Sequence, residues 1–240
     1  MCYHYSMKKS LAKNHTFWFT IINAFLFVST VIVTYITLSF GTVAGQVDTA
    51  TSNSLFYIVT FTILSNIFLG LVGLVGVYFG VKSLKKNQTI PRQYLTWYLV
   101  ATAAGMLTVI TVITFLAPLR AMRGRNYFEM MMGPMFFFHF FNPLLASYAL
   151  IYLTPKERLT RKDCLFAMLP TAFYAIPYVL NVVILHTWYD FYNFTFGGNN
   201  WTIIPVFIVI SLIIFGIASL LAFLHNKKST STSPPLKSVV

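Results

Sequence analysis

The sequence is poor in charge. Only 9% of its 240 residues are Asp, Glu, Lys or Arg, and only five are acidic. Soluble domains carry about 25% charged residues, and no polar stretch of this chain is long enough to fold a core. We therefore expect no separate soluble domain. The hydrophobic residues, 57% of the chain, come in long blocks, which is typical of an integral membrane protein.

The sequence lacks the residues that several kinds of site would need. The two cysteines, Cys2 and Cys164, form no motif, so we expect no disulfide. No cluster of Cys, His and carboxylate side chains has metal-ligand spacing, and we expect no metal and no cofactor. A retinal Schiff base would need a lysine inside an apolar block, and there is none. Ser65 lacks a surrounding Gly-x-Ser-x-Gly pattern, which argues against a rhomboid-type serine protease.

The apolar blocks predict the fold class. A membrane-spanning helix needs about 20 predominantly apolar residues, and in lipid only a helix or a closed barrel satisfies its backbone groups. We predict an all-α polytopic membrane protein, a bundle of six transmembrane helices. The predicted spans are about 17–40, 55–81, 95–117, 127–153, 165–186 and 202–224. They form one transmembrane domain, 1–226, followed by a tail, 227–240, that we expect to be disordered and cytoplasmic.

The basic residues predict the orientation. All but three of the 17 lysines and arginines lie in the N-terminal arm, the loops at 82–94 and 154–164, and the C-terminal tail. The loops at 41–54 and 187–201 have none. Because cytoplasmic loops are enriched in Lys and Arg, we predict cytoplasmic N and C termini, in the plasma membrane. Membrane orientation thus accounts for most of the net charge of +12, and we expect no nucleic-acid partner.

Three arginines break this pattern. Arg120, Arg123 and Arg125 fall on the predicted outer side. Arg125 precedes Glu129 by four residues, so these two can pair along a helix. Arg120 and Arg123 would then flank the outer mouth of the bundle, where guanidinium groups suit an anion such as a carboxylate or phosphate. A plainer interpretation is that the three side chains reach lipid headgroups.

The second predicted span carries a stripe of small residues. Glycines recur every three or four positions at Gly70, Gly73, Gly76 and Gly80. Small residues at this spacing let a neighbouring helix approach closely. We therefore predict a helix-packing face, with a ligand-facing groove as the alternative.

The same span begins with a polar cluster. Thr60 and Thr62 are followed by Ser65 and Asn66, and the spacing places Thr62, Ser65 and Asn66 on one helix face. Hydroxyl groups in membrane helices usually bond their own backbone carbonyls, which is the structural interpretation. Asn66 is harder to explain in that way, because an amide in hydrocarbon needs partners.

The fourth predicted span contains the one histidine deep in any span, His139, followed three residues later by Asn142. An ionisable side chain at this depth is a functional candidate, although it can also be a structural histidine bonded to a neighbouring helix. The second and fourth spans both enter from the predicted outer side. Thr62 and His139 therefore lie at similar depths, and a hydroxyl beside an imidazole is the minimal nucleophile–base pair.

These features resemble a known family. The six spans, the inside termini, "FTILSN" from Phe61 to Asn66 and "HFFNP" from His139 to Pro143 are similar to bacterial six-span proteins related to the androgen-induced and androgen-dependent TFPI-regulating membrane proteins of animals. The animal members hydrolyse fatty acid esters of hydroxy fatty acids with an intramembrane threonine and histidine. The resemblance implies His139 as the histidine, and Thr62 or Thr60 as the threonine.

The resemblance also implies a mechanism. His139 would take the proton of Thr62, whose oxygen would attack the ester carbonyl, and Asn66 or Asn142 would donate to the developing oxyanion. Arg120 and Arg123 would hold the free carboxylate of a fatty substrate at the outer surface. One departure from the family is Phe140, where the animal members have a threonine after the histidine.

Three classes of function therefore remain open from the sequence. The first is an intramembrane hydrolase of fatty acid esters that uses a Thr/His pair. The second is a carrier or binding protein for a lipid or small anion, without catalysis. The third is a structural membrane partner that uses the glycine stripe as its contact face. Membrane lipids are expected partners in all three, and a fatty acyl substrate in the first.

Overall fold

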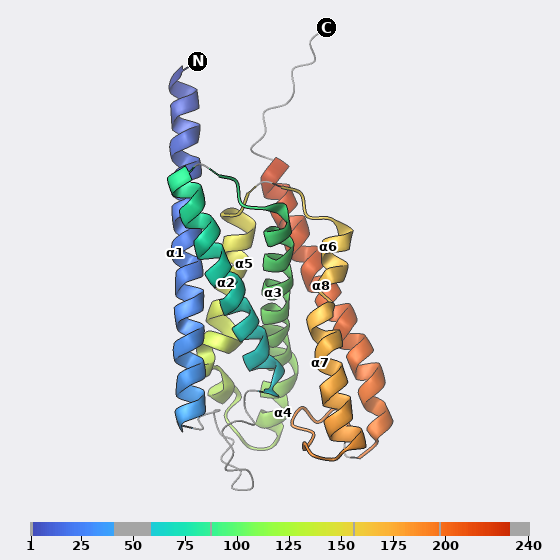
Figure 1. Cartoon of the computed structure of the whole chain (residues 1–240). Coiled ribbons are helices and arrows are strands. Elements are labelled where there is room, and N and C mark those ends of the chain that lie inside the picture. The colour runs from blue at the N-terminus through green and yellow to red at the C-terminus, as the bar shows by residue number, and fades with distance from the viewer. Residues whose placement is uncertain (1, 41–58, 87, 156, 197, 231–240) are drawn as a thin grey trace.

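The computed structural model describes residues 2–40, 59–86, 88–155, 157–196 and 198–230, and within them the chain forms helices and turns and no strand. The α-helices are α1 (Cys2–Phe40), α2 (Phe61–Lys86), α3 (Arg92–Thr111), α4 (Ala117–Met122), α5 (Asn142–Tyr152), α6 (Arg161–Phe166), α7 (Leu169–Val179) and α8 (Ile203–Thr230). The long helices run side by side as one bundle (Figure 1). The predicted all-α class is confirmed.

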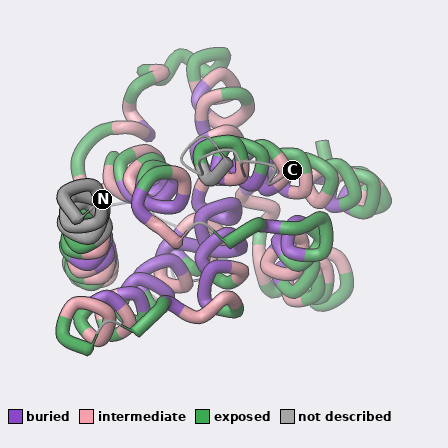
Figure 2. Tube along the Cα trace, turned by 90° about the horizontal axis from the view of Figure 1, so that it is seen from above, coloured by how far each residue is buried: buried purple, intermediate pink, exposed green. Residues whose placement is uncertain are grey.

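Among the described residues, five helical segments are long and apolar enough to cross a membrane: Lys13–Ser39, Phe61–Lys86, Arg92–Met122, Arg161–Ile184 and Asn200–Lys228. They match the first, second, third, fifth and sixth predicted spans. Buried stretches face the centre of the bundle and exposed stretches its periphery (Figure 2). Many of the exposed side chains are large and apolar, such as Val31, Phe173 and Leu212. An apolar periphery of this kind is compatible with an integral membrane protein.

The predicted fourth span, 127–153, is not one continuous α-helix. It begins as the 3₁₀-helix η3 (Tyr127–Met131), turns at residues 132–134, and continues as the π-helix η4 (Phe137–Phe141) and then α5. Gly133 sits in the turn with a positive φ of 59°, which glycine adopts without steric cost. Pro143 has no N–H to donate back to the carbonyl of His139, so the regular α-helical hydrogen bonding is lost at this point.

Two predicted boundaries also differ. The second span was predicted to begin at residue 55. The α-helix α2 begins at Phe61, and residues 55–58 lie outside the described residues. At the other end of the chain, α8 continues to Thr230, so the first residues of the predicted tail are helical. The remaining tail residues, 231–240, lie outside the described residues.

Helix irregularities gather at one end of the bundle, the lower end in Figure 1. There η2 (Val112–Leu116), η4 and η5 (Leu180–Ile184) are all π-helical. The first two end two residues before a proline, Pro118 and Pro143, and the third begins three residues after Pro177. Proline removes an α-helical hydrogen bond. In a π turn the backbone hydrogen bonds join residues five positions apart in place of four, so neighbouring groups can still be paired. The lower end is therefore less regular than the upper end, from which α1 starts and where α8 ends.

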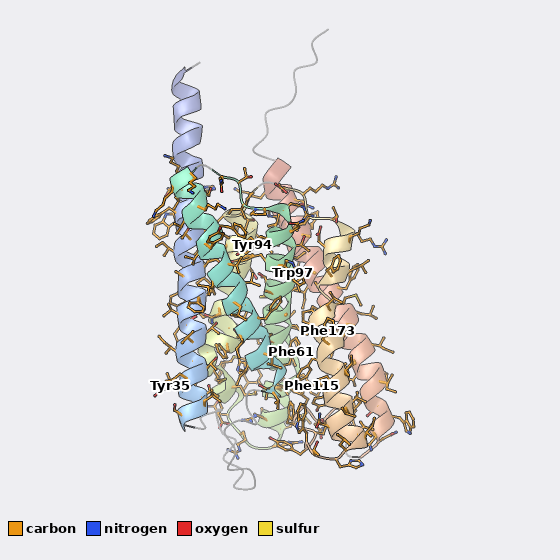
Figure 3. The ribbon with its side chains drawn as sticks, viewed as in Figure 1. Tyr35, Phe61, Tyr94, Trp97, Phe115 and Phe173 are labelled. Carbon is orange, nitrogen blue, oxygen red and sulfur yellow. The ribbon has the colours of Figure 1, made fainter. Side chains whose placement is uncertain are left out.

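The glycine stripe of α2 packs on α1. A Cβ at Gly70 would lie 2.9 Å from the Thr30 side chain, and one at Gly80 would lie 2.1 Å from Thr20 Oγ1. Only hydrogen on these Cα atoms allows the two helices to come so close. The predicted packing face is thus confirmed, and it is used within the chain. Figure 3 shows the side chains around this bundle, including Tyr94 and Trp97 of α3.

Candidate functional site

Thr62, the second residue of α2, lines a cavity of about 40 Å³. The start of α2 lies in the lower half of the bundle in Figure 1. A volume of this size holds a few water molecules. The walls are aliphatic, aromatic and hydroxyl-bearing, and none of the described residues that line it is charged. They are Phe61, Thr62, Leu107, Thr108, Thr111, Val112, Leu116, Thr171, Tyr174, Tyr192, Phe194, Phe207 and Ile210. The cavity therefore offers neutral hydrogen-bonding groups in an apolar enclosure.

Tyr192 closes the cavity at the first turn of α2. Its hydroxyl accepts a hydrogen bond of 3.0 Å from the backbone N–H of Phe61. The first N–H groups of a helix have no acceptor within the helix, so Tyr192 satisfies one of them from a segment far away in sequence. The same hydroxyl interacts with the Thr62 side chain and with Tyr174. Three hydroxyl groups thus meet at the positive end of the α2 dipole.

Tyr174 of α7 lies at the edge of this group. Its side chain is only 7% exposed. Its hydroxyl lies near the Tyr192 hydroxyl and the backbone of Phe61, but it meets neither at full hydrogen-bond geometry within the described structure. A hydroxyl group can donate one hydrogen bond and accept two, so this one retains hydrogen-bonding capacity. The Tyr174 hydroxyl is therefore available to an additional hydrogen-bonding group in the cavity.

A groove lies next to the cavity, between α2, α3 and α7, and opens on the side of the bundle. Its volume is about 370 Å³, and its walls are mostly apolar and aromatic. Trp97 and Phe173 line it and are 50% and 68% exposed; both are labelled in Figure 3, as is Phe61. Phe61 and Tyr174 belong to both spaces. Their rings pack edge to face with centroids 5.3 Å apart, so they separate the groove from the cavity.

The candidate histidine lies apart from this cavity. The His139 ring is buried, and its Nδ1 lies 2.5 Å from the carbonyl oxygen of Met130. The guanidinium of Arg120 is close enough to interact with it electrostatically. His139 is not among the residues that line the cavity, and no hydrogen bond joins its described ring to Thr62. The nucleophile–base pair implied by the family resemblance is not formed in this conformation.

Asn66 nevertheless connects the two segments. Its Nδ2 donates to the carbonyl of Thr62 at 2.9 Å and to the carbonyl of Phe138 at 3.1 Å. The second span and the fourth predicted span are therefore in contact, which a single sequence cannot reveal. Ser65 donates to the same Thr62 carbonyl at 3.1 Å and lies 3.3 Å from Thr108 Oγ1. The polar cluster thus ties α2 to η4 and α3.

The other two polar candidates have separate places. Asn142 is fully buried, and its Oδ1 accepts a hydrogen bond of 3.0 Å from Ser29 of α1. It does not line the cavity, so it acts in the described structure as a tie between α5 and α1. Thr60 is half-buried in the bend before α2, where its carbonyl accepts from the backbone N–H of Leu64 at 3.1 Å.

Two of the three arginines at positions 120–125 contact one carboxylate. Arg125 lies 3.8 Å from Glu129, as the four-residue spacing predicts. Arg120 also lies 3.8 Å from Glu129, so this acid pairs with two arginines where the spacing predicted one. Arg123 is exposed at the C-terminal end of α4. The arginines gather at the lower end of the bundle and do not line the cavity at Thr62.

Sequence reasoning missed the aromatic residues of this site. Tyr174 and Tyr192 belong to a cluster with Tyr178, Phe194 and Phe207. The only signal for it in the sequence was the density of Tyr and Phe around positions 174–194. Such density is equally common in a lipid-facing surface, so it does not single out a cavity.

Asp190 holds the segment that carries Tyr192. Its Oδ1 accepts from the Tyr178 hydroxyl at 2.5 Å and from Phe194 N at 2.9 Å, and its Oδ2 accepts from Thr195 N at 2.6 Å. Burial raises the pKa of Asp190, but these hydrogen bonds outweigh it and lower the pKa below its usual value. The ionised carboxylate therefore fastens residues 190–195 to α7 and fixes Tyr192 at the wall of the cavity.

The described residues contain no group of three or more His, Cys, Asp or Glu side chains that could hold a metal ion. Comparison of the chain with protein-family models, curated proteins and solved structures found no match. The family resemblance of the two short motifs therefore stays a prediction. Fold and site together define a helical protein with apolar helices of membrane-spanning length and a neutral, hydroxyl-lined cavity beside a side groove.

Proposed function

We propose that this chain is a six-span integral membrane protein that binds a membrane lipid through a neutral polar group, such as an ester carbonyl, in the cavity at the start of α2. The observation that carries the proposal is the buried Tyr174 hydroxyl, which retains hydrogen-bonding capacity within the described structure and lies where the side groove meets the cavity. This function belongs to the second class that the sequence left open, a lipid-binding protein without catalysis.

Two observations support six spans with both termini in the cytoplasm. The helical stretch of 135–152 is about 27 Å long at 1.5 Å per residue, close to the hydrocarbon thickness of about 30 Å. The start of α1 and the end of α8 lie at the same end of the bundle in Figure 1. An even number of crossings brings both there, and the basic residues favour the cytoplasm for that end.

The chemistry of the walls supports the choice of ligand. Hydroxyl groups from Thr62, Tyr174 and Tyr192 donate and accept hydrogen bonds but carry no charge. They suit an ester or a hydroxyl group better than a carboxylate, which would need a cation nearby. The groove along Trp97 and Phe173 is apolar and faces outward, so it suits an acyl chain that comes from the surrounding bilayer.

Binding on this scale requires movement. A cavity of about 40 Å³ is too small for more than the polar group of a lipid. The chain of the lipid would lie in the groove, and the rings of Phe61 and Tyr174 would move apart to connect the two. Val112 and Leu116 of η2 line the cavity, and π turns are frequent at functional sites. This wall can adjust more easily than a regular helix.

A photoreactive ester tests the proposal. The purified chain in detergent is irradiated with a long-chain acyl methyl ester that carries a terminal diazirine, and the labelled peptides are identified by mass spectrometry. We expect label along the groove, and a reduction of about fivefold or more in Tyr174→Phe and Thr62→Val, because each loses one hydrogen bond to the ester. The control is Tyr148→Phe, since Tyr148 is half exposed on α5. Equal labelling of all four proteins would refute the proposal.

The second candidate is the intramembrane ester hydrolase. It is favoured by one contact, the bridge from Asn66 to the carbonyls of Thr62 and Phe138, which keeps the two motif-bearing segments together. A rotation of the His139 ring away from Met130 would be needed before it could act on Thr62. Release of methanol from the same probe, lost in His139→Ala but kept in His186→Ala, would favour hydrolysis. Labelling without release would favour binding alone.

A further inference from the structure

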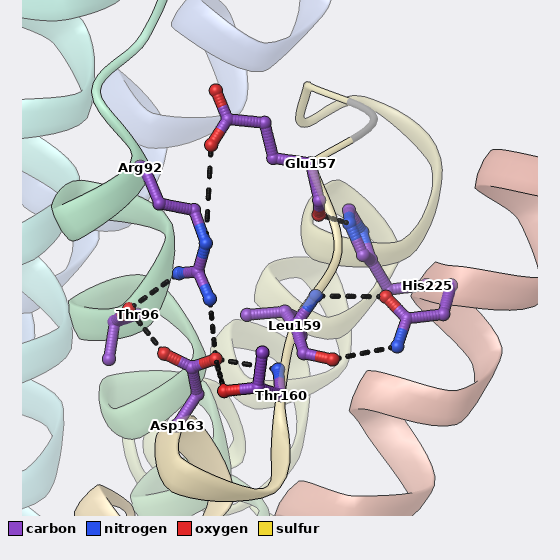
Figure 4. Close-up of polar contacts among 8 residues, drawn as sticks. Arg92, Thr96, Glu157, Leu159, Thr160, Asp163 and His225 are labelled. Atoms are coloured by element: carbon purple, nitrogen blue, oxygen red, sulfur yellow. Dashed lines mark hydrogen bonds and ion pairs between the residues drawn. The ribbon is translucent and has the colours of Figure 1, made fainter.

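The upper end of the bundle has an uncompensated positive charge. The sequence places only two acidic residues there, Glu157 and Asp163. Arg92, at the start of α3, contacts both: its Nη2 lies 2.5 Å from Asp163, and its Nε lies 4.0 Å from Glu157 (Figure 4). Thr96 and Thr160 complete the hydrogen bonding of Asp163. One arginine thus engages both carboxylates of this end.

Within the described structure, only Arg92 forms ion pairs with these two acids at the distances expected of a salt bridge. Five other basic side chains of this end are exposed and lie on two elements, the end of α2 and the stretch that leads into α6. They are Lys85, Lys86, Arg158, Arg161 and Lys162, and we name them the basic band. The bond from Arg92 to Asp163 holds α3 against α6 and so keeps the second group in place. At the lower end, by contrast, Glu129 lies between two arginines.

On α2, a tyrosine ring and a lysine one turn before the basic band pair in the manner of an interfacial anchor. Lys82 lies over the ring of Tyr78, 5.3 Å from its centroid, and donates to the Tyr78 hydroxyl at 3.2 Å. Tyr78 itself is 58% exposed. Tyrosine and lysine with an apolar body and a polar tip gather where hydrocarbon meets headgroups. The basic band therefore lies at the level of the headgroups, next to an apolar helix surface.

We propose that the basic band binds the headgroups of anionic phospholipids. The complementary charge of the ligand, the arginine geometry suited to phosphate and the interfacial position all favour this occupant. Juxtamembrane basic clusters attract anionic lipids by about fivefold in affinity for each Lys or Arg. This site is separate from the cavity at Thr62, so the two proposals are tested independently of each other.

The test compares two lipids on the purified full-length chain. Binding of phosphatidylglycerol and of phosphatidylcholine is titrated in detergent and counted by native mass spectrometry. We expect preference for phosphatidylglycerol, and a loss of about fivefold per removed charge in Lys85→Gln/Lys86→Gln and in Arg161→Gln/Lys162→Gln. Added salt at about 0.5 M should weaken binding to the unaltered chain as well.

The matched control is Arg123→Gln/Arg125→Gln, which removes the same charge from the lower end. It should keep the preference for phosphatidylglycerol. Equal affinity of the unaltered chain for the two lipids would overturn the proposal, and so would an equal loss in the control. If a variant fails to fold, the salt titration of the unaltered chain still tests the proposal. Affinity for phosphatidylglycerol that does not fall with added salt would show that the binding is not electrostatic.

Discussion

Asp190 shows how one side chain fixes the candidate site. The carboxylate accepts hydrogen bonds from a tyrosine of α7 and from two backbone N–H groups of its own segment. Through these bonds it sets the position of Tyr192, which in turn satisfies the first turn of α2. A single acid outside the apolar helices therefore controls the geometry of three hydroxyl groups.

Replacement of this acid should have a pH-dependent effect. The pKa of Asp190 is lowered in the folded chain, so its ionised form stabilises the fold above the unfolded pKa of about 3.9. That stability is lost as the pH falls through the lower, folded pKa. We expect Asp190→Asn to lower the melting temperature at pH 7, and this difference to shrink progressively as the pH falls below about 4. Thermal unfolding in detergent across this range measures it, and a difference that does not change with pH would contradict it.

At the scale of elements, the close approach of α1 and α2 depends on glycine. A Cβ at Gly76 would lie 2.3 Å from the Tyr94 hydroxyl oxygen and 2.8 Å from the Asn23 side chain. Tyr94 cannot easily give way, because its hydroxyl donates to the carbonyl of Val72 at 3.1 Å. Three helices therefore meet at a position where a single methyl group does not fit.

The change Gly76→Ala should destabilise the bundle by about 1–3 kcal/mol through overpacking. Gly216 of α8 is a matched control, because a Cβ there meets nothing within 4 Å. Gly216→Ala should be neutral or slightly stabilising, since alanine favours a helix over glycine by about 0.5–1 kcal/mol. Thermal unfolding of both variants in the same detergent measures the difference. Equal melting temperatures would show that α1 and α2 separate without cost.

The elements also show what the sequence could and could not reveal. The glycine spacing predicted the packing face, because it depends on local helix geometry. The ion pair of Arg125 with Glu129 was also predicted, but Arg125 lies in the bend before η3, so the two residues are close in sequence without sharing an α-helix. The cap of α2 by Tyr192 joins residues 131 positions apart, and no local pattern encodes such a contact. The proposed pairing of Thr62 with His139 stays a prediction, because similar depth in the membrane does not determine which way two side chains point.

On the scale of the whole molecule, the arrangement of the helix ends makes topology testable. Gln88 lies in the loop after α2 at the upper end, and Arg123 lies after α4 at the lower end; both are exposed. In a Cys2→Ser background, Arg123→Cys should react with a membrane-impermeant maleimide on intact cells. Gln88→Cys should react only after permeabilisation, because the basic loops stay inside. Reaction of both on intact cells would contradict the six-span orientation.

The contrast between the two ends of the bundle has a mechanical consequence. Where α1, α2 and α3 touch through glycine and buried aromatic rings, no part can shift without a clash. Where prolines and π turns interrupt the helices, a backbone N–H can change from one carbonyl acceptor to the next at little cost in free energy. The upper end of the bundle is therefore rigid, whereas the lower end can bend. A displacement at the start of α2, near Phe61, should therefore be taken up by bending of the lower end, while the upper end and its charged rim keep their shape.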